Sequence, residues 1–491
     1  MQPRWLGRIE QVTGALVTVA LAGAIGLGIL SVGARSAGLN FIEYGEGPLA
    51  AFVVRWTQEP PGHSWSGVPF TGAPYGPLML GAWRAAAILW PSADVILVGR
   101  LVGGAAAAAL AILVATVVFR QHRSVTASLI AVALLLASPA AEWYSWARVD
   151  TLAAALTASA YVALGRDPRR LILAAVLIVL ASLAKQTAAV HVLPLAFVAS
   201  MLWTVRTGLR FTVVTALLGV AVWGAMAAVY DGYFLHSSMQ TTSSHLSPWM
   251  YLHSAQPWLA AVPTVCMLSA AYVEPMIHSD YALRDRWWVG FLFAAVFGAL
   301  TSLREGSYIN YFIDATWLGA IVAGGACAEL LRRWPARVQT GITVAALLSL
   351  PPVWANHLQR SIPPKFSSGD RARAVLEWSG KGPVLLDADL VGLAPRDLRP
   401  LVNDSFLFRV RDDAGVAPTE LLLERLSEPS TTIVFSRSLE AHISTDRLER
   451  YWPEAILQRI ARDFCLVDRP AELYVYRHKA SAPVCIAVED H

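Results

Sequence analysis

The chain alternates between apolar stretches long enough to cross a lipid bilayer and short loops whose charge changes from one loop to the next. A helix that crosses the hydrocarbon core needs about 20 predominantly apolar residues. About eleven stretches approach that length, and they lie at 11–33, 97–119, 124–142, 151–165, 171–185, 188–204, 211–230, 258–275, 287–303, 311–331 and 339–356. The alternation therefore predicts a polytopic α-helical membrane protein.

The loops between these stretches are of two kinds, which alternate along the chain. One kind is basic and comprises 120–123, 166–170, 206–210, 284–286 and 332–333. The other kind carries most of the carboxylates, namely Glu43, Glu46, Glu59, Glu142, Asp150, Asp231 and Glu305. Short basic loops mark the cytoplasmic side of a membrane protein. We therefore expect a cytoplasmic N-terminus, with the carboxylates gathered on the opposite face.

Composition supports the membrane class and limits the partners. Of 491 residues, 55% are hydrophobic and 15% are charged, whereas soluble domains average about 25% charged residues. The net charge is +4, and its basic residues stand beside apolar stretches, where membrane orientation and anionic lipid headgroups account for them. The sequence therefore predicts contact with membrane lipids and no nucleic-acid partner.

Two regions are expected outside the membrane. The first external loop, 34–97, is rich in Pro, Gly and Trp, and its segments 48–56 and 77–90 are typical of amphipathic interfacial helices. From 365 to 491 the composition turns polar and mixed. We expect a transmembrane domain at 1–357, with the first external loop as part of it, followed by a small extracytoplasmic α/β domain at 365–491.

The polar C-terminal region contains short buried-type runs at 384–386, 432–435 and 473–476 that predict strands, and helical patterns at 420–426 and 446–461. Cys465 and Cys485 also lie there. A disulfide can form if this region is outside the cytoplasm, and the sequence leaves their pairing open.

Two glutamates follow the first apolar stretch. Glu43 and Glu46 are three residues apart and directly precede Pro48, which favours the start of a helix. Such a pair can point into one pocket, where one carboxylate acts as a base toward an acceptor hydroxyl and the other orients it or holds a cation. The alternative is that Glu46 only caps the helix that begins near Pro48.

Charged residues also end two later apolar stretches on the same expected face. Arg148 and Asp150 stand at the edge of the hydrocarbon, where charges are costly and usually functional. The alternative is a structural ion pair. Lys185 and Gln186 interrupt an apolar hairpin, and a lysine there can neutralise a phosphate or extend its ammonium to the interface.

The segment 304–314 bridges two late stretches, again on the expected outer face. Arg304 is basic, while Asn310 and Tyr311 offer hydrogen-bonding and stacking groups suited to a sugar or a diphosphate. Asp314 would lie one turn inside the membrane, where an ionisable residue is a functional candidate by default. The alternative is an aromatic interface belt beside a capped helix. A phosphate-bearing lipid substrate would account for the combination of these groups with the carboxylates.

These motifs together resemble the GT-C glycosyltransferases, membrane enzymes that take a sugar from a polyprenyl-phosphate carrier. The similarity covers about residues 1–357 and is greatest to bacterial members related to protein O-mannosyltransferases and aminoarabinose transferases. The residues that carry it are Glu43-Tyr44-Gly45-Glu46-Gly47-Pro48, Pro74-Tyr75-Gly76-Pro77, Gly99-Arg100, Ser138-Pro139, Arg148-Val149-Asp150, Ala184-Lys185-Gln186 and the segment from Gly306 to Tyr311.

The resemblance implies an inverting transfer from a polyprenyl-phosphate-linked sugar to a hydroxyl of an envelope glycan, lipid or protein. It implies a bacterial inner-membrane protein and catalytic roles for Asp150 and for Glu43 or Glu46, one of which is the base. The implied substrate-binding residues are Tyr75, Arg100, Arg148, Lys185, Gln186, Arg304, Asn310 and Tyr311. Relatives often have an aspartate as the first-loop acid, so the two separated glutamates leave the identity of the base open. The resemblance implies no particular cofactor, and whether a divalent metal takes part is also open.

Two other functions fit the pattern less well. A transporter or flippase of lipid-linked sugars would place its charges near the middle of the membrane, whereas here they gather at one surface. A non-catalytic envelope scaffold would leave Glu43, Asp150 and Lys185 freely replaceable.

Overall fold

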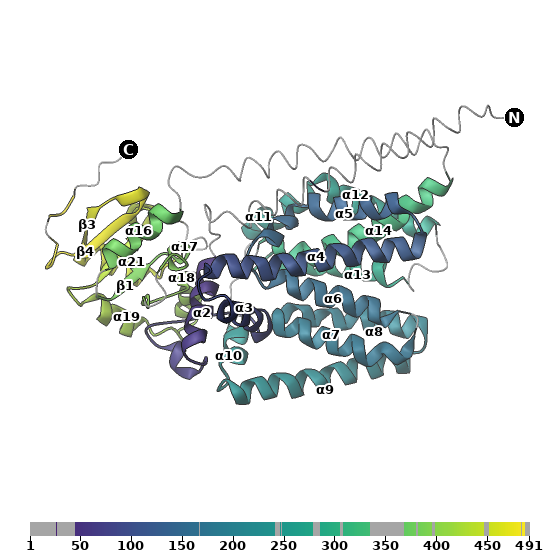
Figure 1. Ribbon diagram of the computed structural model, residues 1–491, viewed down its shortest axis with the longest axis horizontal. Helices are drawn as coiled ribbons and strands as arrows, with labels where there is room; N and C mark the ends of the chain where they lie inside the picture. The colour runs from purple at the N-terminus through teal and green to yellow at the C-terminus, as the bar shows by residue number, and fades with distance from the viewer. Residues whose placement is uncertain are drawn as a thin grey trace, which may run out of the picture. The chain divides into compact units, whose positions relative to one another are not determined.

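The computed structural model describes residues 26, 45–165, 167–240, 246, 248–277, 285–304, 308–333, 368–379, 382–394, 398–445, 451–482 and 484–486 (Figure 1). The predicted base Glu43, the predicted span 339–356 and all of the predicted span 11–33 except residue 26 lie outside these residues. The chain divides into two compact units. We call them the bundle unit (1–37, 103–222 and 245–362) and the sheet unit (38–102, 223–244 and 363–491).

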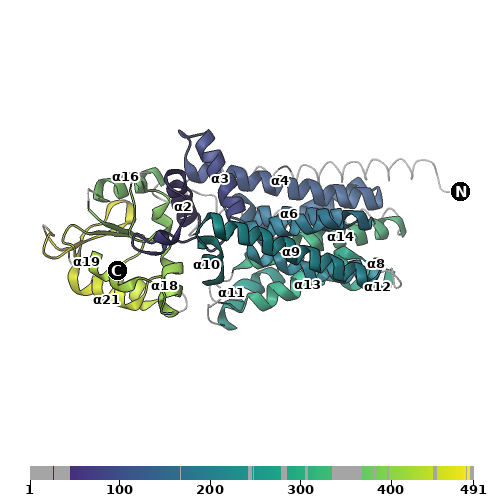
Figure 2. The same ribbon diagram turned by 90° about the horizontal axis from the view of Figure 1, so that it is seen from below.

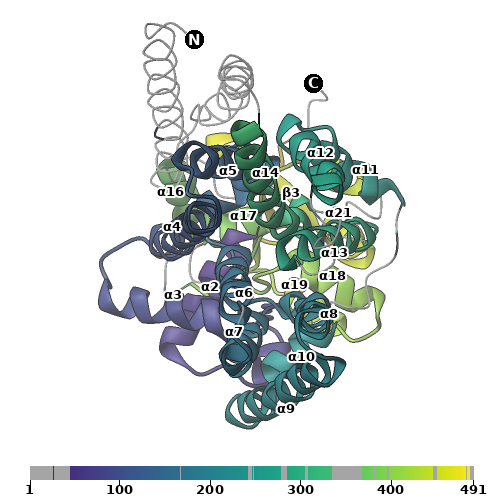
Figure 3. The same cartoon turned by 90° about the vertical axis from the view of Figure 1, so that its right-hand side faces the viewer.

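The bundle unit consists of helices, and the core between them is rich in alanine and aromatic residues. Its helices are α4 (Val95–His122, which begins in the sheet unit), α5 (Val125–Ala137), α6 (Asp150–Leu164), α7 (Leu171–Ala184), α8 (Val192–Leu202), α9 (Val205–Val229, which ends in the sheet unit), α11 (Pro248–Leu259), α12 (Val262–Ile277), α13 (Arg286–Thr301) and α14 (Ile313–Arg333). Helix α6 packs along α7, and α13 packs along α14 (Figure 3). Small residues such as Ala154 and Ala158 let these helices approach closely.

Three helices of the described chain are long and apolar enough to span a membrane: Val95–His122, Val205–Val229 and Ile309–Arg332. Six further apolar helices are shorter. One reason is that 3₁₀ segments interrupt the helical runs, namely η2 (Pro139–Ser145), η4 (Gln186–His191) and η7 (Ile309–Phe312). The predicted total of about eleven spans therefore remains a prediction.

The sheet unit contains a four-stranded sheet in the order β1-β2-β4-β3. The strands are β1 (Val384–Leu386), β2 (Thr432–Phe435), β3 (Phe464–Asp468) and β4 (Tyr474–His478). β1 and β2 are parallel, with Leu385 opposite Ile433, whereas β4 is antiparallel to both β2 and β3. The sheet confirms the small C-terminal sheet predicted from sequence, although β3 was not predicted. Cys465 of β3 forms a disulfide with Cys485.

Helices cover both faces of this sheet, because its strand residues are buried on alternate sides. Leu385 and Ile433 pack with α19 (Thr419–Leu426) and α21 (Glu454–Asp463), and Val384 and Val434 pack with α16 (Ser368–Ser379) and α17 (Ala388–Val391). Figure 2 shows α19 and α21 side by side. The remaining helices of the unit are α2 (Glu46–Gln58), α3 (Pro77–Leu89), α10 (Tyr233–Gln240), α18 (Ser405–Asp413) and α20 (Leu439–Ser444).

Helix α2 comes from the segment that the sequence predicts to be the first external loop, yet it packs against α17 in the C-terminal part of the chain. A Cβ atom at Gly47 would lie 2.1 Å from the carbonyl oxygen of Ala388, so only glycine permits this approach. The sheet unit thus combines the first external loop with the C-terminal region, whereas the sequence placed that loop in a domain at 1–357. The sequence-based domain boundaries remain predictions.

Candidate functional site

Breaks in three helical runs position the polar residues of the bundle unit. Asp150 begins α6 after the η2 segment, Lys185 follows the last residue of α7, and Asn310 lies in η7. All three side chains are buried. A helix break leaves backbone groups without their intrahelical partners, and such irregular backbone is tolerated at membrane depth where protein or a water-filled cavity surrounds it.

These residues form a hydrogen-bonded group around Asp150. Its Oδ1 atom accepts hydrogen bonds from Lys185 Nζ at 2.5 Å and from Asn310 Nδ2 at 2.9 Å. Arg148 Nε lies 4.0 Å from Asp150 Oδ2. The Tyr311 ring centre is 4.6 Å from Lys185 Nζ, which is a cation–π distance. We call these five residues the Asp150 cluster.

Two acceptor atoms of the Asp150 cluster have incomplete hydrogen bonding. Asp150 Oδ2 and Asn310 Oδ1 are buried, and neither has a hydrogen-bond partner among the described residues. Buried polar atoms in native proteins are nearly always hydrogen-bonded, and an exception calls for an explanation such as a ligand, a water or a catalytic role. The cluster can therefore accept further hydrogen bonds, and its ammonium and guanidinium groups are suited to an anion.

A second polar group in the bundle unit surrounds Asp314 of α14. Asp314 Oδ2 lies 3.2 Å from His191 Nε2, and its Oδ1 accepts a hydrogen bond of 2.9 Å from Trp317 Nε1. The other ring nitrogen of His191, Nδ1, is 3.1 Å from the hydroxyl of Tyr161. Sequence reasoning singled out Asp314 but missed His191 and Tyr161. An ionisable histidine within an apolar stretch is a signal that could have found His191.

The sheet unit contains a different carboxylate–cation pair. Arg100 donates from Nε to Glu46 Oε1 at 2.8 Å and from Nη2 to Glu46 Oε2 at 2.6 Å. Glu46 is 0% exposed and Arg100 is 1% exposed. This is the bidentate geometry in which a guanidinium engages both oxygens of a carboxylate.

The other predicted site residues have less defined surroundings. Gln186 opens η4 directly after Lys185 and is partly buried. Tyr75 is partly buried in the sheet unit, and Arg304 follows α13 in the bundle unit, where it forms an isolated β-bridge with Leu246. The structure therefore brings together Arg148, Asp150, Lys185, Asn310 and Tyr311 in one unit and Glu46 with Arg100 in the other.

A further carboxylate, Asp387, follows β1 in the sheet unit. It accepts hydrogen bonds from Trp452 Nε1 at 2.9 Å and from the amide and hydroxyl of Ser436 at 2.8 and 3.0 Å, and it lies 3.2 Å from His442 Nε2. Burial raises the pKa of Asp387, but the interactions with His442, Trp452 and Ser436 outweigh burial and lower it below its ordinary value. Burial and the charge of Asp387 raise the pKa of the neighbouring Asp389 to about 6.

Metal binding was left open by the sequence. Within the described parts of the chain, no three His, Cys, Asp or Glu side chains are grouped so that they could hold a metal ion. The requirement for a divalent metal therefore stays open.

Comparison with known proteins identifies the fold. No protein-family model and no curated protein sequence matches the chain. Among solved structures, it is similar to ArnT from Cupriavidus metallidurans bound to undecaprenyl phosphate, with 13% identity, a TM-score of 0.59 and coverage of 95% of this chain and 99% of that chain.

Two structures from Archaeoglobus fulgidus are also similar. Its oligosaccharyltransferase in complex with zinc and sulfate has 11% identity and a TM-score of 0.54, over 94% of this chain and 73% of that chain. AglB in complex with an inhibitory peptide and a dolichol-phosphate has 10% identity and a TM-score of 0.54, over 96% and 75%. The chain therefore has the fold of these structures, as its resemblance to the GT-C glycosyltransferases predicted.

Proposed function

We propose that this protein of GT-C fold is a glycosyltransferase that moves a sugar from a polyprenyl-phosphate carrier to a hydroxyl of an extracytoplasmic acceptor. The observation that carries the proposal is the Asp150 cluster, a buried group of cations and incompletely bonded acceptors in a bundle of apolar helices. Similar structures were solved with undecaprenyl phosphate or a dolichol-phosphate. By the family resemblance, the protein would be in the bacterial inner membrane. By the charge of its loops, its N-terminus would be cytoplasmic and its C-terminal domain extracytoplasmic.

In this mechanism the cations of the Asp150 cluster stabilise the departing polyprenyl phosphate. Lys185 and Arg148 offer ammonium and guanidinium donors to the phosphate as its charge develops. Asp150 and the Tyr311 ring hold the Lys185 ammonium in place, which removes the cost of orienting it during the reaction. The acceptor atoms Asp150 Oδ2 and Asn310 Oδ1 can orient a hydroxyl of the sugar.

The base is assigned to the first external loop, as the family resemblance implies. Arg100 occupies both carboxylate oxygens of Glu46, which favours a structural role for Glu46 and leaves Glu43 as the preferred base. The base takes the proton of the acceptor hydroxyl, whose oxygen attacks the anomeric carbon while the bond to the phosphate breaks. A single displacement of this kind inverts the configuration at that carbon. The phosphate leaves without needing a proton near neutral pH.

A flippase of lipid-linked sugars is the second candidate, ahead of a non-catalytic envelope scaffold. The observation in its favour is the linked series Asp314, His191 and Tyr161, because ionisable chains inside membrane helices also serve as proton relays in transporters. Transport would move the intact lipid-linked sugar across the membrane and leave the sugar on its carrier.

The test uses the purified protein in lipid nanodiscs with a panel of radiolabelled polyprenyl-phosphate sugars, scored by loss of label from the carrier. Wild type is compared with Glu43→Gln, Lys185→Met and the matched control Lys479→Met, which removes the charge of an exposed lysine in the sheet unit. We expect turnover by wild type and the control and its loss in the other two variants. Folded wild-type protein that binds these lipids but releases no label would instead favour the flippase.

A further inference from the structure

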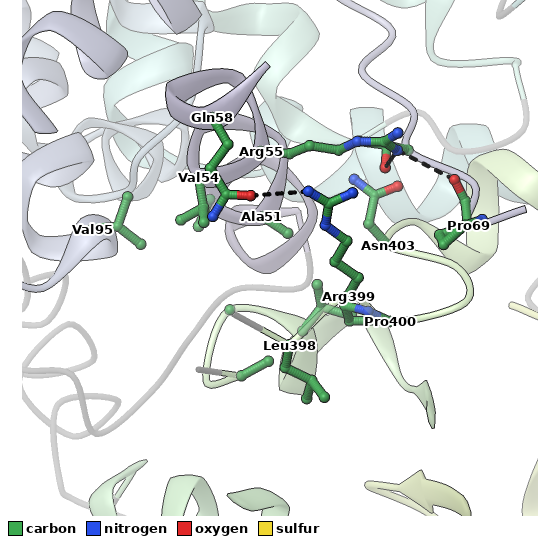
Figure 4. Close-up of a pocket in the computed structure, with 15 residues that line it drawn as sticks. Ala51, Val54, Arg55, Gln58, Pro69, Val95, Leu398, Arg399, Pro400 and Asn403 are labelled. Carbon is green, nitrogen blue, oxygen red and sulfur yellow. Dashed lines mark hydrogen bonds between the residues drawn. The ribbon is translucent and has the colours of Figure 1, made fainter. Parts of the chain in front are cut away.

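A small cavity of about 60 Å³ lies within the sheet unit, between α2 and the segments 391–394 and 398–403 (Figure 4). Its lining includes the apolar residues Ala51, Val54, Val95 and Leu398, which we call the apolar wall. It also includes the polar residues Arg55, Gln58, Thr71, Arg399 and Asn403, which we call the polar wall. The cavity therefore offers both apolar and polar surface to a ligand.

Arg55 is the fixed cation of this cavity. Its guanidinium donates to Thr71 Oγ1 at 2.6 Å and to Glu59 Oε1 at 2.6 Å, and it lies 4.3 Å from the centre of the Trp65 ring. Asn403, also of the polar wall, is buried and donates to the carbonyl oxygen of Pro48 at 3.1 Å. These contacts hold the polar wall in a defined position before any ligand binds.

Arg399 is the more exposed cation, at the rim of the cavity. Its side chain is 53% exposed and reaches toward α2, where it donates to Gln58 Oε1 at 3.3 Å (Figure 4). Its Nη1 atom is 3.8 Å from Glu59, which lies outside the lining. No lining residue is acidic among those that the structure describes. The lining thus contains two guanidinium groups and an apolar wall within one small space.

We infer that this cavity binds a small organic anion, a phosphate or carboxylate group that carries a short alkyl portion. Guanidinium groups form charge-assisted hydrogen bonds with both kinds of oxyanion. The wall of Ala51, Val54 and Leu398 gives the alkyl portion an apolar surface, which inorganic phosphate cannot use. The inference does not depend on glycosyl transfer, because it concerns the sheet unit and its test measures binding.

The test titrates the full-length protein in nanodiscs with butyl phosphate, butyrate, inorganic phosphate and butylammonium, followed by saturation-transfer NMR. Binding of butyl phosphate or butyrate, tighter than that of inorganic phosphate and butylammonium, is the expected result. The stronger of the two organic anions identifies the oxyanion. Absence of saturable binding by both, or equal binding of butylammonium, would overturn the inference. Inorganic phosphate that binds as tightly as butyl phosphate would overturn the role of the apolar wall.

A matched pair of arginine variants locates the binding. Arg399 and Arg425 both have side chains that are 53% exposed and both lie near a glutamate. Only Arg399 lines the cavity. Arg399→Gln should weaken binding about tenfold, which corresponds to about 1.4 kcal/mol, whereas Arg425→Gln should leave it unchanged. Equal effects of the two variants would contradict the assignment.

A third variant tests the cavity without changing its charge. Ala51→Phe fills the space beside α2 and should also reduce the affinity for butyl phosphate, while thermal unfolding shows whether the fold is kept. Unchanged affinity in a folded Ala51→Phe protein would place the bound anion elsewhere and overturn the inference.

Discussion

Two buried carboxylate–cation pairs, one in each unit, differ in how completely their hydrogen bonds are made. In the sheet unit, Arg100 engages both oxygens of Glu46. In the bundle unit, Lys185 and Asn310 both engage Asp150 Oδ1, and Oδ2 has no hydrogen bond among the described residues. Both pairs bury opposite charges in the protein, yet only the second leaves an acceptor available.

The number of hydrogen bonds made by the two carboxylate oxygens distinguishes a structural ion pair from a candidate ligand site. A buried acceptor without a hydrogen bond costs about 1–3 kcal/mol. A fold that retains such an atom beside a lysine and an arginine has a polar site that a ligand can complete. A bidentate pair such as Glu46 and Arg100 already satisfies the carboxylate, so it is suited to holding α2 against the start of α4. We therefore propose a catalytic role for the Asp150 cluster and a structural role for the Glu46–Arg100 pair.

The largest expected effect is that of Lys185→Met on donor turnover. The substitution removes the ammonium that would face the departing phosphate, and we expect a loss of about a thousandfold, in the range seen when one electrostatic donor is removed from a transition state. Single-turnover release of label from the carrier measures it. A loss below threefold would contradict the contrast between the two pairs, because Lys185 and Asp150 would then not take part in the reaction.

The next largest expected effect is that of Glu46→Gln on the free energy of unfolding. Glu46→Gln leaves the buried Arg100 charge without its carboxylate partner, and breaking a buried ion pair in this way costs about 3 kcal/mol or more. Replacing both residues, Glu46→Leu with Arg100→Met, should recover most of that loss, since apolar residues of similar volume often substitute for a buried pair without cost. Thermal unfolding in nanodiscs measures both variants. A double variant no more stable than Glu46→Gln would contradict a purely structural role.

The smallest expected effect tests the same contrast between two carboxylates of the sheet unit, Asp387 and Asp389. Asp387 has several donors and a lowered pKa, whereas the pKa of Asp389 is raised to about 6 from its ordinary value of 3.8. The folded protein therefore binds this proton more tightly than the unfolded chain, and the stability contributed by Asp389 falls as pH rises from about 4 to about 6. Asp389→Asn should stabilise the protein by about 2 kcal/mol at pH 7.5 and by little at pH 4. Unfolding temperatures at the two pH values check this, and equal shifts at both would exclude titration of Asp389 as the cause.

Much of the fold was predictable because it depends on local patterns. Apolar length predicted the helical membrane class, and the short apolar runs at 384–386, 432–435 and 473–476 predicted three strands of the sheet. β3 was missed although its sequence Phe464–Asp468 contains an apolar run of the same kind. The membership of α2 in the sheet unit could not be predicted, because it depends on a contact between Gly47 and Ala388, far apart in sequence.

The candidate site was predictable in its residue types but not in its pairings. The motifs identified Arg148, Asp150, Lys185, Asn310 and Tyr311, which the structure places together. They gave no indication that Arg100 pairs with Glu46, since the two residues are separated by 54 positions. Side-chain pairings between distant segments are decided by packing, which neither charge nor periodicity encodes.

The most direct test of the central claim is donor turnover by the double variant Glu46→Leu/Arg100→Met, measured beside Lys185→Met in one assay. The account predicts that the folded double variant keeps turnover within about threefold of wild type, a change of less than 1 kcal/mol, while Lys185→Met loses nearly all of it. Loss of turnover in a folded double variant as large as that in Lys185→Met would contradict this division of roles and give the Glu46–Arg100 pair a part in the reaction.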